Sequence, residues 1–299
     1  MAGLAAGQRL QSAGWRVTIV DKGRVAGGRM ATRTFDEGRF DYGAQFFTTR
    51  DDSFAELARP WIASGLAVPW TEHRFRSAEG MRAVAETLAA GLDVRTGVKV
   101  VRVESAGGGW TVELETGETV QTGKLLLTPP VPQSLALLEQ GGVELEAADR
   151  GVLEQASYWK CVTILVRVEG TTQVGENGFA EPGDGVLAWV GDNQAKGVSA
   201  MPGCLTLHGT REFSEAHWDE PQAVAVHAML AAAEPYFSGR VRSYYLHRWR
   251  YAEPAMQMPE LFHAVDRLVF AGDVFGGGRV GGAVASGLAA ANYLVATAS

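Results

Sequence analysis

The chain has 299 residues, of which 46% are hydrophobic, 20% charged and 9% aromatic, and its formal net charge is −7. This composition is typical of a soluble globular protein with room for two domains. No stretch is both apolar and long enough to cross a bilayer, and no export signal precedes the first helical pattern, so we expect a cytoplasmic protein. The acidic balance counts against a general nucleic-acid surface.

The first fifty residues begin with a helix pattern and then a strand pattern. Gly3 to Ser12 is rich in Ala and Leu, and Gly14 supplies a helix stop. Val17 to Val20 is a short apolar run that ends at Asp21, which indicates a buried strand. This order is the second half of a βαβ unit.

The rest of the chain continues with alternating strand and helix patterns and contains no internal repeat. Asp52 to Ala63 and Pro221 to Ala233 are predicted to be amphipathic helices. Near the end, a buried strand at Leu268 to Ala271 leads through glycines into a helix at Ala283 to Leu294. Gly-rich turns indicate a strand meander formed by Val98 to Val103, Trp110 to Leu114 and Thr119 to Leu127.

The first motif is part of a dinucleotide fingerprint, which needs a strand, then G-x-G-x-x-G, a helix and an acid about 20 residues later. Met1 and Ala2 match the two x positions, Gly3 the third glycine and Asp21 the acid. Taken alone, Gly3 fits plain helix packing better. We expect the first strand of the sheet, and the two glycines after it, to be missing from the chain as written. That strand would lie between Val17 to Val20 and Leu268 to Phe270.

A second motif, Gly27-Gly28-Arg29-Met30, follows the acid. Two glycines let the backbone approach phosphates closely, and an arginine can neutralise phosphates with a planar fork of donors. The alternative is a Gly-Gly turn that precedes a surface arginine.

A third motif is AGDVFGGGRVGGAVASGLAAA, from Ala271 to Ala291. Its strand brings Asp273 to the end of the sheet, where a carboxylate can bond a polyol, and the next helix aims its amides at an electron-rich group. A glycine-rich turn of any α/β protein is the alternative. Three such elements in this order favour a dinucleotide site.

The order of these motifs, with D-x-G-A-Q at Asp41 to Gln45, resembles the FAD-containing amine oxidase superfamily, and within it the renalase family. DYGAQFFTTRD, LAWVGDNQAKG, LTLHGTREFSEAHW and LHRWRYAEPA are also similar to renalase segments. The resemblance implies a doubly wound, Rossmann-like FAD-binding domain with an interwoven α+β substrate domain. The domains would comprise 1–50, 93–130 and 264–299 for FAD and 51–92 and 131–263 for the substrate.

The resemblance also implies the cofactor residues and the reaction. Non-covalent FAD would be reduced by dihydronicotinamide isomers with hydride at ring position 2 or 6 and reoxidised by dioxygen to give hydrogen peroxide. A flavin amine oxidase with an aromatic cage, and an inactive remnant, are the alternatives. The residues implied at the cofactor are Gly3, Asp21, Lys22, Gly27, Gly28, Arg29, Met30, Gln45, Val100, Gly272, Asp273, Arg279 and Val280.

The substrate site is predicted at Tyr244 to Tyr251. No Ser-His-Asp set, metal cluster or C-x-x-C is evident, which suits hydride transfer, because the cofactor supplies that chemistry. If this segment is extended, His247, Trp249 and Tyr251 share one face and the arginines between them the other. Asn193 is expected to bond the nicotinamide carboxamide. The alternative is that these aromatics are core residues. We expect Cys161 and Cys204 to be free thiols.

Overall fold

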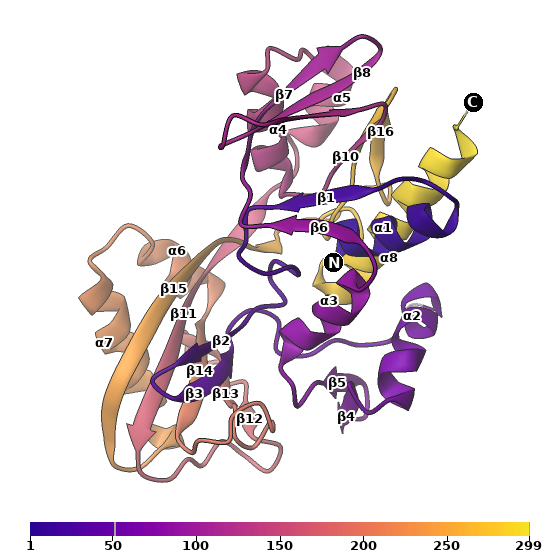
Figure 1. The fold of residues 1–299 in the computed structure, drawn as a ribbon. Coiled ribbons are helices and arrows are strands. Elements are labelled where there is room, and N and C mark those ends of the chain that lie inside the picture. The colour runs from indigo at the N-terminus through magenta and orange to yellow at the C-terminus, as the bar shows by residue number, and fades with distance from the viewer. Residues whose placement is uncertain (51, 299) are drawn as a thin grey trace.

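A computed structural model describes residues 1–50 and 52–298 as two lobes (Figure 1). The first lobe contains both ends of the chain and the short parallel strands, and the second contains one long antiparallel sheet. None of the described helices combines the length and the apolar character that crossing a membrane would require.

Short buried strands form the sheets of the first lobe. β1 (Thr18–Asp21) pairs in parallel with β6 (Asp93–Thr96), and β10 (Leu125–Leu127) pairs in parallel with β17 (Leu268–Phe270). β16 (His263–Val265) adds an antiparallel edge to β17. Runs such as Leu-Leu-Leu and Leu-Val-Phe suit strands that are covered on both faces. The prediction of a Rossmann-like α/β domain is confirmed.

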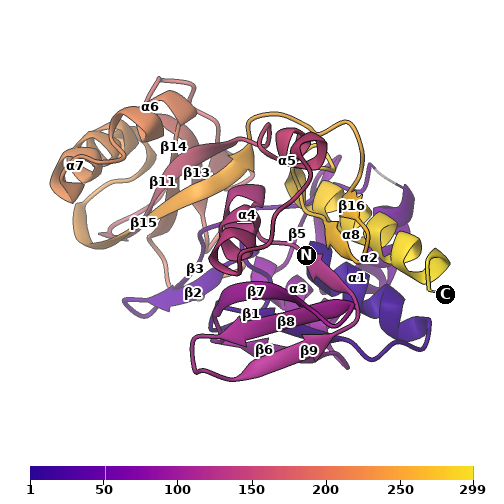
Figure 2. The ribbon, with the colours of Figure 1, turned by 90° about the horizontal axis from the view of Figure 1, so that it is seen from above.

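Four helices cover these strands. α1 (Ala2–Ser12) and α8 (Arg279–Ala296) lie side by side in two views (Figures 1 and 2), and α2 (Asp52–Ala63) and α3 (Met81–Ala89) pack into the same hydrophobic cluster. At Gly287 of α8, a Cβ would lie 2.2 Å from the Ala2 carbonyl oxygen, so a glycine is required for this close approach.

The meander is formed as predicted except at its last strand. β7 (Val100–Ala106), β8 (Gly109–Leu114) and β9 (Thr119–Thr122) make an antiparallel sheet. Thr119 to Leu127 is therefore not one strand, because the chain turns at Gly123, where the Thr122 hydroxyl donates to the Lys124 carbonyl oxygen at 2.8 Å. β10, the second half, joins the parallel sheet.

The predicted position of a further strand beside Leu268 to Phe270 is wrong. β17 is paired on both of its edges, by β10 and β16. Among the described residues, β1 pairs only with β6 and β10 only with β17, and residues of both strands line one cavity. The order of strands around β17 could not be deduced from the sequence, because three-residue strands carry too few side chains to specify their neighbours.

The second lobe is an antiparallel sheet in the order β12-β13-β14-β11-β15. Its apolar face packs against α6 and α7 in a cluster formed by this lobe alone. The predicted helix at Pro221 to Ala233 is confirmed as α7, with Pro221 as its N-cap. The bounds are β11 (Tyr158–Glu169), β12 (Phe179–Ala180), β13 (Leu187–Asp192), β14 (Cys204–Gly209), β15 (Arg240–Pro254), α6 (Arg211–Ala216) and α7 (Gln222–Ala233).

Two hairpins and three short helices complete the described fold. The hairpin of β2 and β3 lies against β14 of the second lobe. The bounds are β2 (Thr32–Phe35), β3 (Gly38–Asp41), β4 (Val68–Thr71), β5 (Arg74–Arg76), α4 (Val131–Gln140), α5 (Ala147–Leu153) and the 3-10 helix η1 (Glu234–Tyr236).

The division of the chain into two domains stays a prediction. The segment 51–92 was assigned to the substrate domain, yet its helices α2 and α3 share a hydrophobic cluster with α1 and α8 of the first lobe. Likewise α4 packs with β7 and β17 through Leu135 and Leu138. Packing therefore joins these helices to the cofactor-binding part of the chain.

Candidate functional site

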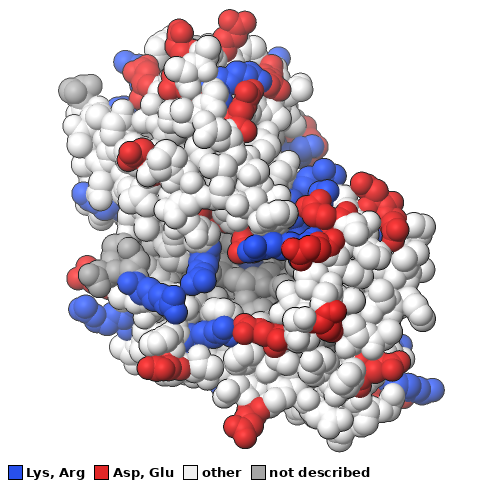
Figure 3. Space-filling view, turned by 180° about the vertical axis from the view of Figure 1, so that it is seen from behind, with Lys and Arg blue, Asp and Glu red and all other residues white. Residues whose placement is uncertain are grey.

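A single cavity of about 2600 Å³ runs along the first lobe and into the second. Figure 3 shows a hollow between the lobes with Lys, Arg, Asp and Glu side chains near its rim. All thirteen residues predicted at the cofactor line this cavity, as do His247, Trp249 and Tyr251. Asn193 does not.

One end of the cavity is formed where β1 ends. Asp21 is the last residue of this strand, and its carboxylate accepts a hydrogen bond from the Gly23 amide at 2.7 Å. Lys22 follows it, with its ammonium 3.4 Å from the Gln133 side-chain oxygen, and Val100 lines the same cavity from the start of β7. A carboxylate at the end of a parallel strand suits a ribose hydroxyl pair.

The middle of the cavity is bordered by two helix N-termini. Gly3 lies in the first turn of α1, where a Cβ would be 3.1 Å from the Thr128 hydroxyl oxygen. Neither α1 nor α8 has a side chain that caps its first turn. Their leading amides are therefore available to an electron-rich group.

The loop before α8 has an unusual backbone. Gly277 and Gly278 have φ of 76° and 80°, and Arg279 has φ of 62°, a value that a non-glycine residue adopts at a cost of about 1–2 kcal/mol. Gly276 lies so close to Gly282 that a Cβ on it would be 2.0 Å from the Gly282 carbonyl oxygen. The first turn of α8 is thus held in one place beside the cavity.

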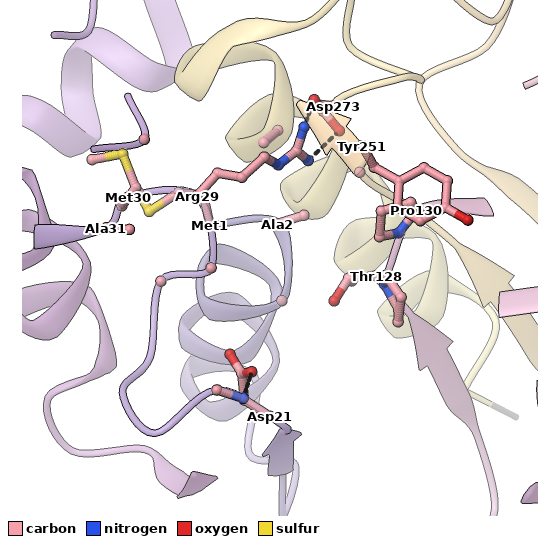
Figure 4. Close-up of a pocket in the computed structure, with 18 of the residues that line it drawn as sticks. Met1, Ala2, Asp21, Arg29, Met30, Ala31, Thr128, Pro130, Tyr251 and Asp273 are labelled. Atoms are coloured by element: carbon pink, nitrogen blue, oxygen red, sulfur yellow. Dashed lines mark hydrogen bonds and ion pairs between the residues drawn. The ribbon is translucent and has the colours of Figure 1, made fainter. Parts of the chain in front are cut away.

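Arg29 and Asp273 form the central ion pair of the cavity (Figure 4). The two guanidinium nitrogens Nη1 and Nη2 each donate to one carboxylate oxygen at 2.7 Å, and Nη1 also donates to the Ala252 carbonyl oxygen at 3.0 Å. Burial opposes the charge of Arg29, but the charge and hydrogen bonds of Asp273 outweigh it, so the pKa of Arg29 is raised. A fixed cation therefore lies between the two helix N-termini.

Glycines let the segment around Arg29 pack tightly. At Gly27, with φ of 110°, a Cβ would lie 2.6 Å from the Ala85 Cβ, and at Gly43 it would lie 1.9 Å from the Arg29 carbonyl oxygen. The Ala44 amide donates to that same oxygen at 2.9 Å. The side chain of Met30 is 2% exposed and anchors the segment in the core.

These features fit a dinucleotide cofactor. The cavity offers a carboxylate at one end, helix amides and an arginine in its middle, and a second carboxylate, Asp273, beside them. An adenosine ribose, a pyrophosphate and a ribityl chain need donors and acceptors in that order.

The far end of the cavity has an aromatic wall formed by β15 and the residue after β3. The Tyr42 ring stacks on Trp249 with centroids 5.3 Å apart and meets His247 edge-on at 5.2 Å. The Trp249 indole N–H donates to the Tyr42 carbonyl oxygen at 2.9 Å. Tyr251 meets Tyr158 edge-on at 5.5 Å.

The predicted alternation along β15 agrees with these contacts. Arg248 donates from Nη2 to the Glu220 carbonyl oxygen, and Arg250 lies 5.7 Å from the Trp218 ring, both away from the Tyr42 wall. His247 has no hydrogen-bond partner among the described residues. Burial first, and the charge of Arg33 second, lower the pKa of His247. Its ring is therefore neutral at pH 7, with both nitrogens available.

The structure does not place Asn193 where the sequence predicted it. Its side chain is 1% exposed, its oxygen accepts from the Asp41 amide at 3.0 Å, and its nitrogen donates to the Cys204 carbonyl oxygen and the Thr206 hydroxyl. These partners occupy its donors and its acceptor, so Asn193 joins strand β3 to strand β14 and its amide does not face the cavity.

A buried ion pair beside Asn193 escaped the sequence analysis. The Lys196 ammonium lies 2.6 Å from Asp41 Oδ2, and both side chains are buried. Asp41 Oδ1 accepts from the Met81 amide at 2.9 Å and so caps helix α3, whose own N-cap is Gly80. Burial lowers the pKa of Lys196, while the charge of Asp41 opposes that shift.

Gln45 connects this ion pair to the cavity. Its side-chain oxygen accepts from Lys196 at 3.4 Å, and its nitrogen lies 3.3 Å from His208 Nε2. Burial first, and Lys196 second, lower the pKa of His208 to about 4, so the ring is neutral at pH 7. His208 Nε2 then accepts from Gln45, and Nδ1 carries the proton 3.8 Å from the Cys161 sulfur. Burial raises the pKa of Cys161 to about 11, and both cysteines are free, as predicted.

Comparison with protein families identifies two regions. Residues 1–60 match the NAD(P)-binding Rossmann-like domain, and residues 61–150 match flavin containing amine oxidoreductases. A phytoene desaturase (neurosporene-forming) from Cereibacter sphaeroides is 48% identical over 48 residues, which are 16% of this chain and 9% of that protein. The match thus spans less than a tenth of the length of this relative.

Solved structures are similar over nearly the whole chain. A putative protoporphyrinogen oxidase from Exiguobacterium sp. 255-15 has a TM-score of 0.69 and 13% identity, and covers 99% of this chain and 96% of its own. A CLA-producing fatty acid isomerase from P. acnes has a TM-score of 0.69 and 12% identity, and the match covers 100% of this chain and 96% of the isomerase. A putrescine oxidase bound to putrescine has a TM-score of 0.66 and 16% identity, and the match covers 99% of this chain and 97% of the oxidase. At these identities the likeness shows a shared fold.

Proposed function

The chain is a member of the flavin-containing amine oxidase superfamily, with FAD as its cofactor, and we propose that it oxidises 2- or 6-dihydro isomers of NAD(P) with dioxygen. The dihydronicotinamide ring loses two electrons and one hydrogen as hydride and becomes an aromatic pyridinium. Dioxygen takes up those electrons with that hydrogen and one proton from solvent, which gives hydrogen peroxide. FAD supplies the carrier for the two electrons.

The charge of the cavity carries this proposal. Lys and Arg outnumber Asp and Glu by fifteen to six among the residues that line the cavity, although the whole chain has a net charge of −7. Such a lining attracts a dinucleotide, whose phosphates are anionic, and repels an alkylammonium ion. FAD accounts for part of this charge. Arg33 is a further cation of this lining, and among the described residues its side chain has no acidic partner.

The aromatic wall supports a planar substrate. Tyr42, His247 and Trp249 line the cavity with ring faces and edges that suit a nicotinamide. Since Asn193 is buried away from the cavity, the neutral ring of His247 is our candidate for the carboxamide hydrogen bond. Hydride transfer removes no proton from the substrate ring, so the wall needs to place the ring and exclude water, and it needs no general base.

The amine oxidase alternative required an aromatic cage for a cation. Aromatic rings do gather at Phe46, Phe179 and Trp189, but the Arg74 guanidinium lies 4.4 Å from the Phe46 ring centroid and 5.1 Å from that of Phe179. Glu181 pairs with this arginine at 2.9 Å. The cation in these rings therefore belongs to the protein itself.

Anaerobic stopped-flow reduction of the flavin-loaded protein tests the proposal. We expect 2- or 6-dihydro isomers to bleach the flavin rapidly and simple amines such as putrescine to do so slowly, with hydrogen peroxide formed once air is admitted. Trp249→Ala should slow reduction more than it lowers flavin content. Tyr244→Ala, on the same strand but exposed and outside the cavity, is the matched control. Faster reduction of the flavin by amines would favour the amine oxidase alternative. A folded protein that binds no flavin would favour the alternative of an inactive remnant.

A further inference from the structure

Arg33, on strand β2, packs against aromatic rings at the edge of the aromatic wall. Its guanidinium carbon lies 3.8 Å from the Tyr245 ring centroid and 5.9 Å from that of Tyr42. Arg33 lines the cavity, and its Nε is buried without a hydrogen-bond partner. Arg33 belongs to none of the sequence motifs.

Other cations near the wall have protein partners. Arg74 pairs with Glu181, and Arg211 pairs with Glu253, both at 2.9 Å. Arg82 pairs with Glu86 at 3.1 Å. Lys160 pairs with Glu215 at 2.8 Å, and Arg29 pairs with Asp273 at 2.7 Å. These cations are neutralised before any ligand enters.

Arg33 differs from them. Among the described residues it has no acidic partner and no hydrogen bond, and its charge already acts on His247, whose pKa it helps to lower. Arg250 also lacks an acidic partner there, but it lies over Trp218 on the other side of β15. Arg33 is thus the unpaired cation on the Tyr42 side of the strand.

The stacking on Tyr245 prepares this guanidinium for an anion. A cation over an aromatic face keeps its in-plane N–H donors free and loses little further rotamer entropy when a ligand binds. The planar fork of donors matches two oxygens of a phosphate. A ring stacked along the Tyr42 and Trp249 wall would carry its phosphate toward this fork.

We propose that Arg33 binds the phosphate next to the nicotinamide ribose and so selects dihydronicotinamide nucleotides over phosphate-free dihydronicotinamides. This inference rests on the proposed function and names the part of the substrate that the site recognises. Arg33 is a binding residue in this scheme and takes no part in the transfer of hydride.

Two ligands, one with and one without the ribose phosphate, test the proposal without turnover. Nicotinamide mononucleotide and N-methylnicotinamide are titrated into the flavin-loaded protein by calorimetry. We expect Arg33→Met to weaken binding of the mononucleotide about 10- to 100-fold, the range of one charge-assisted hydrogen-bonded contact, and to change N-methylnicotinamide less than about twofold. Arg33→Lys should retain part of the affinity, because it keeps the charge but lacks the fork. Arg242→Met, exposed and outside the cavity, is the control.

Reduction kinetics form the second measurement. With 6-dihydro-NAD, Arg33→Met should raise the half-saturating concentration and leave the limiting rate of flavin reduction within about twofold, since uniform binding is lost. An equal loss for both titrated ligands would show that Arg33 only supports the wall, and equal affinity of the wild type for both would show that no phosphate is bound. Either result overturns the proposal. If no dihydronicotinamide reduces the flavin but the mononucleotide still depends on Arg33, the proposed function fails and the binding site stands.

Discussion

Arg29 and Asp273 are 244 positions apart in the chain and are joined by two parallel hydrogen bonds of 2.7 Å. The first residue follows β1 and the second follows β17, so the pair connects the two ends of the Rossmann-like domain across the cavity. The Asp273 side chain is 8% exposed and that of Arg29 is 32% exposed. The buried carboxylate of Asp273 therefore has the Arg29 guanidinium as its counter-charge.

Asp273→Asn should lower both flavin content and stability. The substitution leaves a half-buried guanidinium without its counter-charge, which we expect to reduce the free energy of unfolding by about 1–3 kcal/mol. Flavin absorbance per protein and denaturant unfolding measure the two effects. Glu118→Gln, which breaks an exposed ion pair with Arg95, should change the free energy by less than about 1 kcal/mol. Full flavin content and unchanged stability in Asp273→Asn would contradict a central role for this pair.

Gly43→Ala should displace the segment that carries Arg29. The new Cβ would lie 1.9 Å from the Arg29 carbonyl oxygen, and that oxygen belongs to the backbone, so it cannot move away cheaply. We expect a loss of about 1–3 kcal/mol or more, with reduced flavin content. Gly123→Ala meets no atom within 4 Å and serves as the control. Equal melting temperatures for the two variants would refute the close approach.

Lys196→Met should destabilise the protein by about 3–5 kcal/mol, because it leaves the buried carboxylate of Asp41 unpaired. Asp41→Asn leaves the buried ammonium unpaired and should also be costly. The double variant should lose less than the sum of the two, since neither charge is then buried alone. Chemical unfolding of the four proteins gives the coupling energy. A coupling energy near zero would mean that the side chains of Lys196 and Asp41 do not interact.

His208 should make the folded protein less stable as the pH falls. Its pKa is about 4 in the folded chain against an ordinary 6.5. Between these values the unfolded state binds more protons, so the free energy of unfolding decreases with decreasing pH. At pH 4.5 the loss from this residue is about 2 kcal/mol relative to pH 7.

Unfolding of wild type and His208→Gln at the two pH values checks this effect. The variant should lose about 2 kcal/mol less than the wild type on going to pH 4.5. The exposed His73 is the control position, and His73→Gln should follow the wild type. A His208→Gln protein with the same pH dependence as the wild type would show that burial does not suppress protonation of His208.

The residues that the sequence patterns assign to the cofactor line one cavity because each motif ties a residue type to a backbone geometry. Asp21 ends a strand, Gly3 begins a helix, and Asp273 joins a strand to a helix, and these local rules bring all three to one cavity. The prediction failed where long-range packing decides. The amide of Asn193 is a suitable ligand donor by chemistry, but the two lobes already use it.

Residues that lie outside the motifs could not be found from the sequence. Lys196 and Arg33 belong to no motif with a geometric meaning, and their roles depend on Asp41 and Tyr245, which are 155 and more than 200 positions away. His208 could have been suspected from its place in LTLHGT, yet nothing in that segment indicates that Gln45 would face it. Packing of the β2–β3 hairpin and the residues after it against the second lobe determines these contacts, and a single sequence does not specify that packing.

The close packing of α1 against α8 has a consequence for how the chain is made. Ala6 and Leu10 of the first helix pack with Ala290 and Leu294 of the last in one cluster, and Gly287 touches Ala2. During synthesis α1 therefore cannot pack against α8 until almost the whole chain has left the ribosome. Contacts of such high sequence separation slow folding. Because residues of both helices line the cavity, the cavity is complete only when translation is almost finished.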